Sequence, residues 1–474
     1  MDRLSRKREQ FMKISPARSR ALAILALALS TLPFRLAADD FAFHEPGARA
    51  AGLGGAFTAR SDDPIGLFYN PAGLAFQTGF RIKTDIGFGK RETTATWPDS
   101  GTRYHTDPSE FTGNIALSWQ PIKRVTIATG FFSPYNYDAY WSPGWPGETV
   151  CARNRVRSLY FRSAVAVEVF KGFAVSGGVD VVSSDLWWRH YIPFNIPNYP
   201  LDRDIDIESS HTGHGSGLGF TAGALWKIVP AVQIGVRYQQ DVAIDYTGSN
   251  MFIQPMDTTG QTVPRPGGGT IRVSDLIDLY YADQDVTAQL KFPRTLAGGI
   301  AVSPAAALSL YVDIQWDRWE GFGDWIFTSV NEGDALNPAF PPSYQEFYGL
   351  PLDYGVQGVP LTLMDTKDIK TGVEYRPAQH IAIRAGYARR ASSVDEAGRT
   401  PIYPDLDRNL YSIGFGYEGP LFSIYSEDEK VSDLSFDVFL RYASASSGAS
   451  TFPGLELTYD SGRLTFGIGA GFVF

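Results

Sequence analysis

The sequence predicts an all-β protein, a 14-stranded antiparallel β-barrel that spans a membrane. From about residue 79 onward, apolar and polar residues alternate in one segment after another, which indicates strands with one apolar face. The connections between these segments alternate between short and long. Mean hydropathy is -0.14, with 20% charged and 14% aromatic residues. Such an average is typical of a barrel wall, because only every second residue faces lipid.

The N-terminus has the features of a secretory signal. Several basic residues precede the apolar run 21–29, ALAILALAL. We expect residues 1–38 to be removed, with cleavage after Ala37 or Ala38. No later apolar run approaches the ~18 residues of a membrane-spanning helix. The chain is therefore expected to be exported and to have no helical anchor.

The predicted strands follow in order from the alternating pattern. In one of them, Phe161, Ser163 and Val165 lie on one face and Arg162 and Ala164 on the other. The last strand places Leu464, Phe466 and Ile468 on one face together with the terminal Phe474. The fourteen expected strands are 79–90, 113–119, 125–133, 157–170, 173–190, 214–228, 232–247, 286–302, 307–317, 366–375, 380–390, 409–417, 434–443 and 463–474.

The connections distinguish a barrel from a soluble sandwich. Short turns are expected at 120–124, 171–172, 229–231, 303–306 and 376–379, and long loops at 91–112, 134–156, 191–213, 248–285, 318–365 and 391–408. Short turns at one end and long loops at the other are typical of outer-membrane barrels. The connection at 418–433 is longer than its neighbours and departs from this pattern.

A glycine-rich stretch, residues 46–76, precedes the first strand. It is too rich in glycine for a stable helix and too interrupted for a strand. Asn70-Pro71 marks a turn within it. Such a segment has little stability of its own and requires a larger structure around it.

Within this stretch, residues 51–59 (AGLGGAFTA), the pair Asp62-Asp63 and residues 68–75 (FYNPAGLA) resemble the N-terminal hatch of the FadL family. The late segments Phe292-Pro293-Arg294, 384–387 (RAGY) and Asp407-Arg408 resemble the family's later strands. The family consists of outer-membrane transporters of long-chain fatty acids and other hydrophobic compounds. The resemblance implies a hatch at 39–78 that plugs a barrel at 79–474. The hatch residues that carry the match are Gly54, Gly55, Phe57, Asp62, Asp63, Asn70, Pro71 and Ala72.

Transport of an apolar molecule past such a plug needs an apolar capture surface and pocket. A group of aromatic residues suits this role, because a few buried rings can hold an alkyl chain at ~25 cal/mol per Å². The alternative for the residues nearest the strand is an aromatic girdle at the level of the lipid headgroups. These residues are Phe131, Phe132, Tyr135, Tyr137, Tyr140, Trp141 and Trp145.

A fatty acid also carries a carboxylate, which pairs best with Arg or Lys. The lumen-facing candidates are Arg162, Arg237, Lys370 and Arg384. Alternatively, these bases pair with the inward acids Glu168, Asp313, Asp317, Glu374 and Asp437 in structural networks. In the hatch, we expect Arg60, Asp62 and Asp63 to fix the plug to the wall.

The resemblance also implies an exit through a side window, where the third strand bends inward. Gly130 is the residue of the matching strand best able to bend. The alternative is that Gly130 is an ordinary strand glycine. Release through the wall would pass a ligand directly into the hydrocarbon layer.

Other motifs are weak. His211 and His214 have metal-like spacing but no third ligand, and residues 202–208 are an acidic loop without the glycine of a calcium loop. Cys151 is the only cysteine, so no internal disulfide forms. We expect no metal, no cofactor and no enzymatic step. The formal charge of -9 gives no support for a nucleic-acid partner.

The sequence therefore predicts passive outer-membrane transport of hydrophobic compounds, most specifically long-chain fatty acids, in a Gram-negative-type bacterium. The alternative is a related barrel that serves as a structural or secretion-partner platform without ligand flux. The expected partners are outer-membrane lipid, lipopolysaccharide, the hydrophobic ligand and, through Phe474, the barrel-assembly machinery. The barrel is expected to be a monomer.

Overall fold

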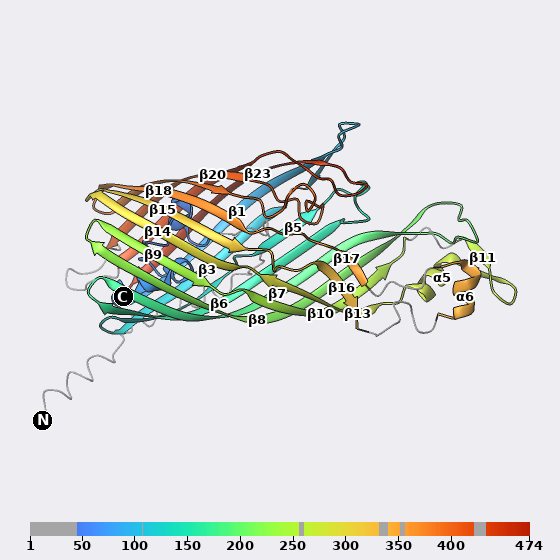
Figure 1. Cartoon of the computed structure of the whole chain (residues 1–474), viewed down its shortest axis with the longest axis horizontal. Coiled ribbons are helices and arrows are strands. Elements are labelled where there is room, and N and C mark those ends of the chain that lie inside the picture. Colours follow the sequence, from blue (N-terminus) through green and yellow to red (C-terminus); the bar gives the residue numbers. More distant parts are fainter. Residues whose placement is uncertain (1–44, 107, 256–259, 331–339, 351–355, 421–432) are drawn as a thin grey trace, which may run out of the picture. The chain divides into compact units, whose positions relative to one another are not determined.

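The fold is taken from a computed structural model of the whole chain (Figure 1). It describes residues 45–474 except 107, 256–259, 331–339, 351–355 and 421–432. The expected signal peptide, residues 1–38, and most of the connection 418–433 lie outside the described residues. Among the helices that are described, none combines the length and the apolar character needed to cross a membrane.

The wall is a closed 14-stranded antiparallel barrel, as predicted. Its sheet contains 21 strands, because seven of the fourteen wall positions are occupied by two strands in succession. The uninterrupted positions are β1 (Phe80–Thr96), β6 (Arg153–Phe170), β7 (Phe173–Phe194), β8 (Ile205–Val229), β19 (Ile381–Arg390), β20 (Arg408–Pro420) and β23 (Thr458–Val473). The interrupted positions are β2 (Arg103–Thr106) with β3 (Ser109–Ile122), β4 (Val125–Phe132) with β5 (Asn136–Tyr140), β9 (Val232–Gln239) with β10 (Val242–Ile253), β13 (Gln284–Phe292) with β14 (Arg294–Ala305), β15 (Leu308–Arg318) with β16 (Trp325–Ser329), β17 (Val356–Val359) with β18 (Thr366–Ala378), and β21 (Asp433–Ala445) with β22 (Gly448–Ala449).

The barrel closes where its first and last strands pair. β1 and β23 run antiparallel in continuous register from Arg81 opposite Val473 to Thr96 opposite Thr458. At the end of this seam, Phe80 and Phe474 exchange both backbone hydrogen bonds, at 3.2 and 2.8 Å. No edge strand is left at the seam, which is the arrangement that removes unpaired edges from a sheet.

The predicted alternation of faces is confirmed along the wall. On β6, Phe161 and Val165 are exposed, whereas Arg162 and Ala164 are buried. On β23, Leu464, Phe466 and Ile468 are exposed and face outward. Large apolar side chains thus cover the outside of the barrel, and charged side chains line the lumen, as the chemistry of a lipid-embedded wall requires.

One interruption breaks the pairing between neighbouring strands. β4 pairs with β3 only up to Phe131 opposite Ile115, and β5 pairs with β6 but, among the described pairings, not with β3. Pro134 lies between β4 and β5, and it has no N–H to donate to a ladder. The stretch of β3 from Ser109 to Asn114 pairs with β1 on its other side. The wall therefore has a gap in its backbone pairing between β3 and β5.

The long loops at one end of the barrel build a small module with its own core. It contains the helices α5 (Val273–Tyr280) and α6 (Pro342–Tyr348) and the hairpin β11 (Thr262–Pro264) and β12 (Thr270–Arg272) (Figure 1). Its buried side chains form a cluster separate from the main core. At the opposite end, short turns connect β3 to β4, β6 to β7 and β8 to β9.

The glycine-rich stretch folds as two short helices and a 3-10 helix. These are α3 (Ala48–Gly52), α4 (Gly66–Tyr69) and η1 (Pro71–Phe76). Gly54 has a φ of +67°, and a Cβ there would lie 2.8 Å from the backbone nitrogen of Tyr387 on β19. A side chain at this position is therefore excluded both by backbone conformation and by the close approach of the wall. We call residues 45–78 the lumen segment.

Candidate functional site

Backbone groups of the lumen segment are hydrogen-bonded to wall strands from different parts of the barrel. Asp85 on β1 accepts the N–H of Ala48 at 2.7 Å. Asp313 on β15 accepts the N–H groups of Phe57 at 2.9 Å and Thr58 at 2.7 Å. Because these strands lie apart in the ring, the segment lies across the lumen. Each contact satisfies a buried backbone donor that would otherwise be costly to desolvate.

Further anchors come from three wall arginines and one asparagine of the segment. Arg162 and Arg237 both donate to the carbonyl oxygen of Phe68, at 3.0 and 2.8 Å. Arg441 donates to the carbonyl oxygen of Ala51 at 2.9 Å. Asn70, which the sequence indicates as a turn residue and as part of the hatch motif, donates to the carbonyl oxygen of Ala224 on β8 at 3.0 Å. These bonds fix the segment at several points along its length.

Glu45 is an anchoring residue of the lumen segment that the sequence did not indicate. Its carboxylate is buried and lies 2.6 Å from Arg390, 3.1 Å from Lys370 and 2.7 Å from Arg441. A single acid next to a glycine-rich stretch carries no pattern, so only the fold shows its three basic neighbours. A buried carboxylate is tolerated because these cations surround it.

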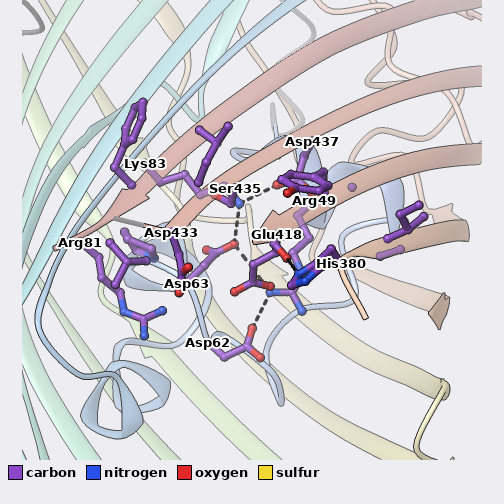
Figure 2. A pocket seen from close by; sticks show the side chains of 18 of the residues that line it. Arg49, Asp62, Asp63, Arg81, Lys83, His380, Glu418, Asp433, Ser435 and Asp437 are labelled. Atoms are coloured by element: carbon purple, nitrogen blue, oxygen red, sulfur yellow. Dashed lines mark hydrogen bonds and ion pairs between the residues drawn. The ribbon is translucent and has the colours of Figure 1, made fainter. Parts of the chain in front are cut away.

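A second charged network joins the lumen segment to the end of the barrel that carries the short turns (Figure 2). Arg49 contacts Asp62 at 2.7 Å and Glu374 at 3.3 Å. Lys83 contacts Asp63 at 3.0 Å and Asp437 at 2.8 Å. The network borders a small pocket of about 70 Å³ that is partly open to solvent. The expected pinning of the segment is carried by the Asp63–Lys83 pair, whereas Arg60 pairs with Asp62 inside the segment.

Three of the four bases proposed to bind a carboxylate are ion-paired within the protein. Arg162 makes a two-point contact with Asp180 at 2.6 and 2.8 Å, and Lys370 contacts Glu45. Arg384 contacts Glu374 at 2.8 Å and Asp437 at 2.6 Å. Wall and segment acids thus pair with Arg162, Lys370 and Arg384, as the alternative of structural networks requires, and their role as ligand contacts stays a prediction.

Arg237 differs from the other three. It is 2% exposed, and within the described part of the chain no acid lies within 4.0 Å of its guanidinium. It donates to Phe68 and weakly to Gln239, at 3.4 Å, and its Nε has no acceptor in the described part of the chain. A buried cation with an unused donor is costly unless a partner arrives.

The aromatic residues proposed for capture are mostly inside the protein. Phe132, Tyr135, Tyr137, Trp141 and Trp145 are all 1% exposed or less. An exterior capture surface built from them is therefore wrong. Phe131 and Tyr140 are exposed, and Phe131 lies on the outer face of β4, as the girdle alternative requires. Aromatic side chains occur both in a barrel interior and in a girdle at the lipid headgroups, so the residue types alone do not distinguish the two locations.

The buried rings form an aromatic cluster above the lumen segment. Phe132 lies 5.4 Å from Phe68 of the segment, and Tyr135 stacks on Phe292 at 4.8 Å. Trp319 meets Tyr135 edge-on at 6.0 Å. We define the aromatic cluster as Phe68, Phe132, Tyr135, Tyr160, Phe292 and Trp319. Arg237 lies 5.4 Å over the ring of Phe68 and so borders the cluster.

At the end with the long loops, residues 141–152 meet residues 391–407. Trp141 and Trp145 stack at 4.6 Å, and the indole of Trp141 donates to the carbonyl oxygen of Pro401 at 3.1 Å. Asn154 donates to the carbonyl oxygen of Ile402 at 2.7 Å. These contacts form a cap over the lumen at this end.

Gly130 is not where the third wall position bends. It pairs with Ala116 on one side and Arg162 on the other, inside the regular part of β4. Pairing stops at Ser133, Pro134 and Tyr135 instead. The proline was the signal that could have located the break, because proline within a strand ends its ladder.

His211 and His214 do not form a shared site. His211 is buried and stacks on Trp188 at 5.0 Å, whereas His214 faces outward and contacts Asp185 at 2.8 Å. Positions three apart on a strand lie on opposite faces. Over the described residues, no group of three or more His, Cys, Asp or Glu side chains is arranged to hold a metal ion.

A closed barrel with apolar exterior, polar lumen and an internal N-terminal segment defines an outer-membrane transport barrel. Residues 37–425 match the family described as Outer membrane protein transport protein (OMPP1/FadL/TodX), and the chain belongs to this family. Its members transport hydrophobic compounds across the outer membrane of Gram-negative bacteria. The predicted family is thus confirmed.

Several solved structures share this fold. A Pseudomonas aeruginosa FadL homologue is 16% identical, with a TM-score of 0.74 over 92% of this chain and 100% of the other. The P. putida toluene transporter TodX is 13% identical, with a TM-score of 0.65 over 92% and 99%. The Ralstonia pickettii toluene transporter TbuX is 15% identical, with a TM-score of 0.61 over 90% and 98%. The sequence matches no curated protein.

Proposed function

We propose that the protein carries long-chain fatty acids across the outer membrane by passive diffusion, with no chemical step. The observation that supports this substrate is Arg237, a buried cation without an acidic partner among the described residues, at the border of the aromatic cluster. A molecule with an apolar chain and one carboxylate matches both features. The chain would displace contacts among the rings, and the carboxylate would accept from the free Nε of Arg237.

The proposed path has three parts. A ligand passes the cap, occupies the aromatic cluster above the lumen segment, and leaves sideways through the gap between β3 and β5. The lumen segment acts as the hatch, because its backbone is bound to several wall strands and it lies across the direct route. Lateral exit is supported by the position of the gap: Phe132 and Tyr135 of the cluster flank the interruption at Ser133 and Pro134.

Uptake of radiolabelled oleate and of toluene into cells tests the substrate. Replacing Arg237 with Gln removes the cation and should lower oleate uptake by about tenfold or more, since hydrogen bonds to charged groups contribute about 1.5–3 kcal/mol. Toluene uptake should change little, because toluene has no carboxylate. Arg237→Lys keeps the charge and should retain part of the oleate uptake. Equal loss for both substrates would contradict a carboxylate role.

A second candidate is transport of small aromatic hydrocarbons, and the ring-rich composition of the cluster favours it. The solved toluene transporters TodX and TbuX share the fold. In that case toluene uptake exceeds oleate uptake in the unmodified protein, and Arg237→Gln leaves both unchanged. The platform alternative predicts no uptake of either compound above cells that lack the protein.

A further inference from the structure

The outer face of the barrel carries four arginines just above its lipid-facing band. Along the outward positions of β6, Arg153, Arg155 and Arg157 precede the apolar Leu159 and Phe161. Arg189 on the neighbouring β7 lies opposite Arg153 in the strand register. We call these four residues the outer arginine patch. β6 follows the long loop 141–152, so the patch lies at the extracellular end of the wall.

Two of the four arginines have no acid to pair with among the residues that the structure describes. The acids of this face are engaged elsewhere: Asp138 contacts Arg153 at 2.9 Å, Glu208 contacts Arg189 at 3.7 Å, and Asp185 contacts His214 at 2.8 Å. Within the described part of the chain, no carboxylate lies within 4.0 Å of Arg155 or Arg157. Asp185 lies opposite Arg157 in the register, yet it is held by His214.

The two arginines are also held in place and partly desolvated. Arg155 lies 5.0 Å over the ring of Trp187, and Arg153 covers the same ring at 4.6 Å. The Nε of Arg157 is buried and has no acceptor among the described residues. A shallow groove on this face is bordered by Arg155, Trp187, Thr212, His214 and Thr247. The patch therefore combines fixed cations, an indole and small polar side chains.

We propose that the outer arginine patch binds a phosphate group of the glycolipid that forms the outer leaflet, with Arg155 and Arg157 as the phosphate ligands. Arginine suits a phosphate because its planar donors match the phosphate oxygens. Arg157 is two residues, roughly 7 Å, from Leu159 along the strand. At that height the phosphates of a lipid A headgroup lie next to the patch while its acyl chains cover Leu159, Phe161 and Val165.

Binding of fluorescent lipid A to the purified full-length barrel in detergent tests the proposal. The probes are lipid A with both phosphates and the same lipid A with its phosphates removed. Arg155→Gln combined with Arg157→Gln should weaken binding of the phosphorylated form about 25-fold, since each cation near a charged lipid surface contributes roughly a factor of five. The dephosphorylated form should bind the unmodified barrel as weakly as the phosphorylated form binds the double variant.

Arg389→Gln is the matched control. Arg389 is also outward-facing at the extracellular end of a strand, but it is paired with Asp407 at 3.6 Å, so its loss should leave lipid A affinity unchanged. Heat-modifiable migration on gels verifies that each variant is folded. Unchanged affinity in the double variant, equal binding of dephosphorylated lipid A, or displacement of lipid A by an equal concentration of inorganic phosphate would each overturn the proposal.

Discussion

Tyr135 and Phe292 stack face to face, with 4.8 Å between ring centroids and 10° between ring planes. Each residue is adjacent in sequence to a proline that interrupts its strand, Pro134 between β4 and β5 and Pro293 between β13 and β14. The two interruptions are far apart in sequence, and the stacked rings bring them together inside the barrel. The aromatic cluster is therefore built at two of the points where the wall departs from a regular ladder.

The stack predicts a measurable coupling between the two rings. Tyr135→Ala and Phe292→Ala should each destabilise the barrel, and the double variant should lose about 1 kcal/mol less than the sum of the two. The free energies come from guanidinium unfolding in detergent, followed by tryptophan fluorescence. Strict additivity would show that the rings do not stabilise one another.

The burial of Glu45 among three basic residues predicts that removing its charge strongly destabilises the protein. Glu45→Gln leaves Arg390, Lys370 and Arg441 without their shared carboxylate, and breaking a buried pair costs about 3–5 kcal/mol. We expect the lumen segment to loosen and to become sensitive to trypsin, which gels resolve over time. Glu418→Gln is the control, because Glu418 is 54% exposed and lies 3.9 Å from its partner. If both variants resisted trypsin equally well, Glu45 would not anchor the lumen segment.

If ligands leave through the gap between β3 and β5, closing this gap should stop their uptake. Deleting Pro134 alone removes the one extra residue, because Asn136 follows Phe131 by five positions while their partners on β6, Arg157 and Phe161, are four apart. The strand then keeps its inside and outside faces, and β4 and β5 can become continuous. Oleate uptake should fall to the level of cells without the protein, whereas gel migration should still report a folded barrel.

Deleting Gly267 and Gly268 in the hairpin between β11 and β12 is the control for this experiment. A Cβ at either residue would have no neighbour within 4 Å, so the loop is free to shorten and uptake should persist. Persistent uptake after repair of the wall would exclude the lateral route.

The reactivity of the Cys151 thiol tests whether the cap stays closed. Burial raises the pKa of its thiol, so at neutral pH the thiolate that reacts with disulfide reagents is scarce, and the side chain is also inaccessible at 0% exposure. The folded protein should fail to react with Ellman's reagent and should release one equivalent after denaturation. Cys151→Ser with Ser100→Cys moves the thiol to an exposed turn and should react at once. Rapid reaction of native Cys151 would show that the cap opens readily.

The wall was predictable because alternation is a local property. The expected strand 157–170 corresponds to β6 (Arg153–Phe170), and the expected 380–390 to β19 (Ile381–Arg390). Alternation also placed Arg162 and Arg384 toward the lumen, which their burial confirms. Several strands are longer than expected at the end of the barrel that carries the long loops. There they continue beyond the lipid-facing band, where they no longer have an apolar face.

The partners of the lumen-facing bases were not predictable in the same way. Arg162, Lys370 and Arg384 pair with acids, while Arg237 does not, and the difference depends on how the lumen segment lies against the wall. That segment has no periodicity, so its position follows from contacts between residues distant in sequence. The same reason explains why aromatic residues near the loops were assigned to the exterior instead of the interior.

The reciprocal hydrogen bonds between Phe80 and Phe474 have a consequence for biogenesis. The ring is sealed when β23 pairs with β1, so a nascent chain that ends before β23 cannot complete it. Because Phe80 follows the lumen segment almost immediately, this segment is joined to one side of the last seam to form. Enclosure of the lumen segment and closure of the barrel are therefore coupled in time, and a chain truncated before β23 would leave both incomplete.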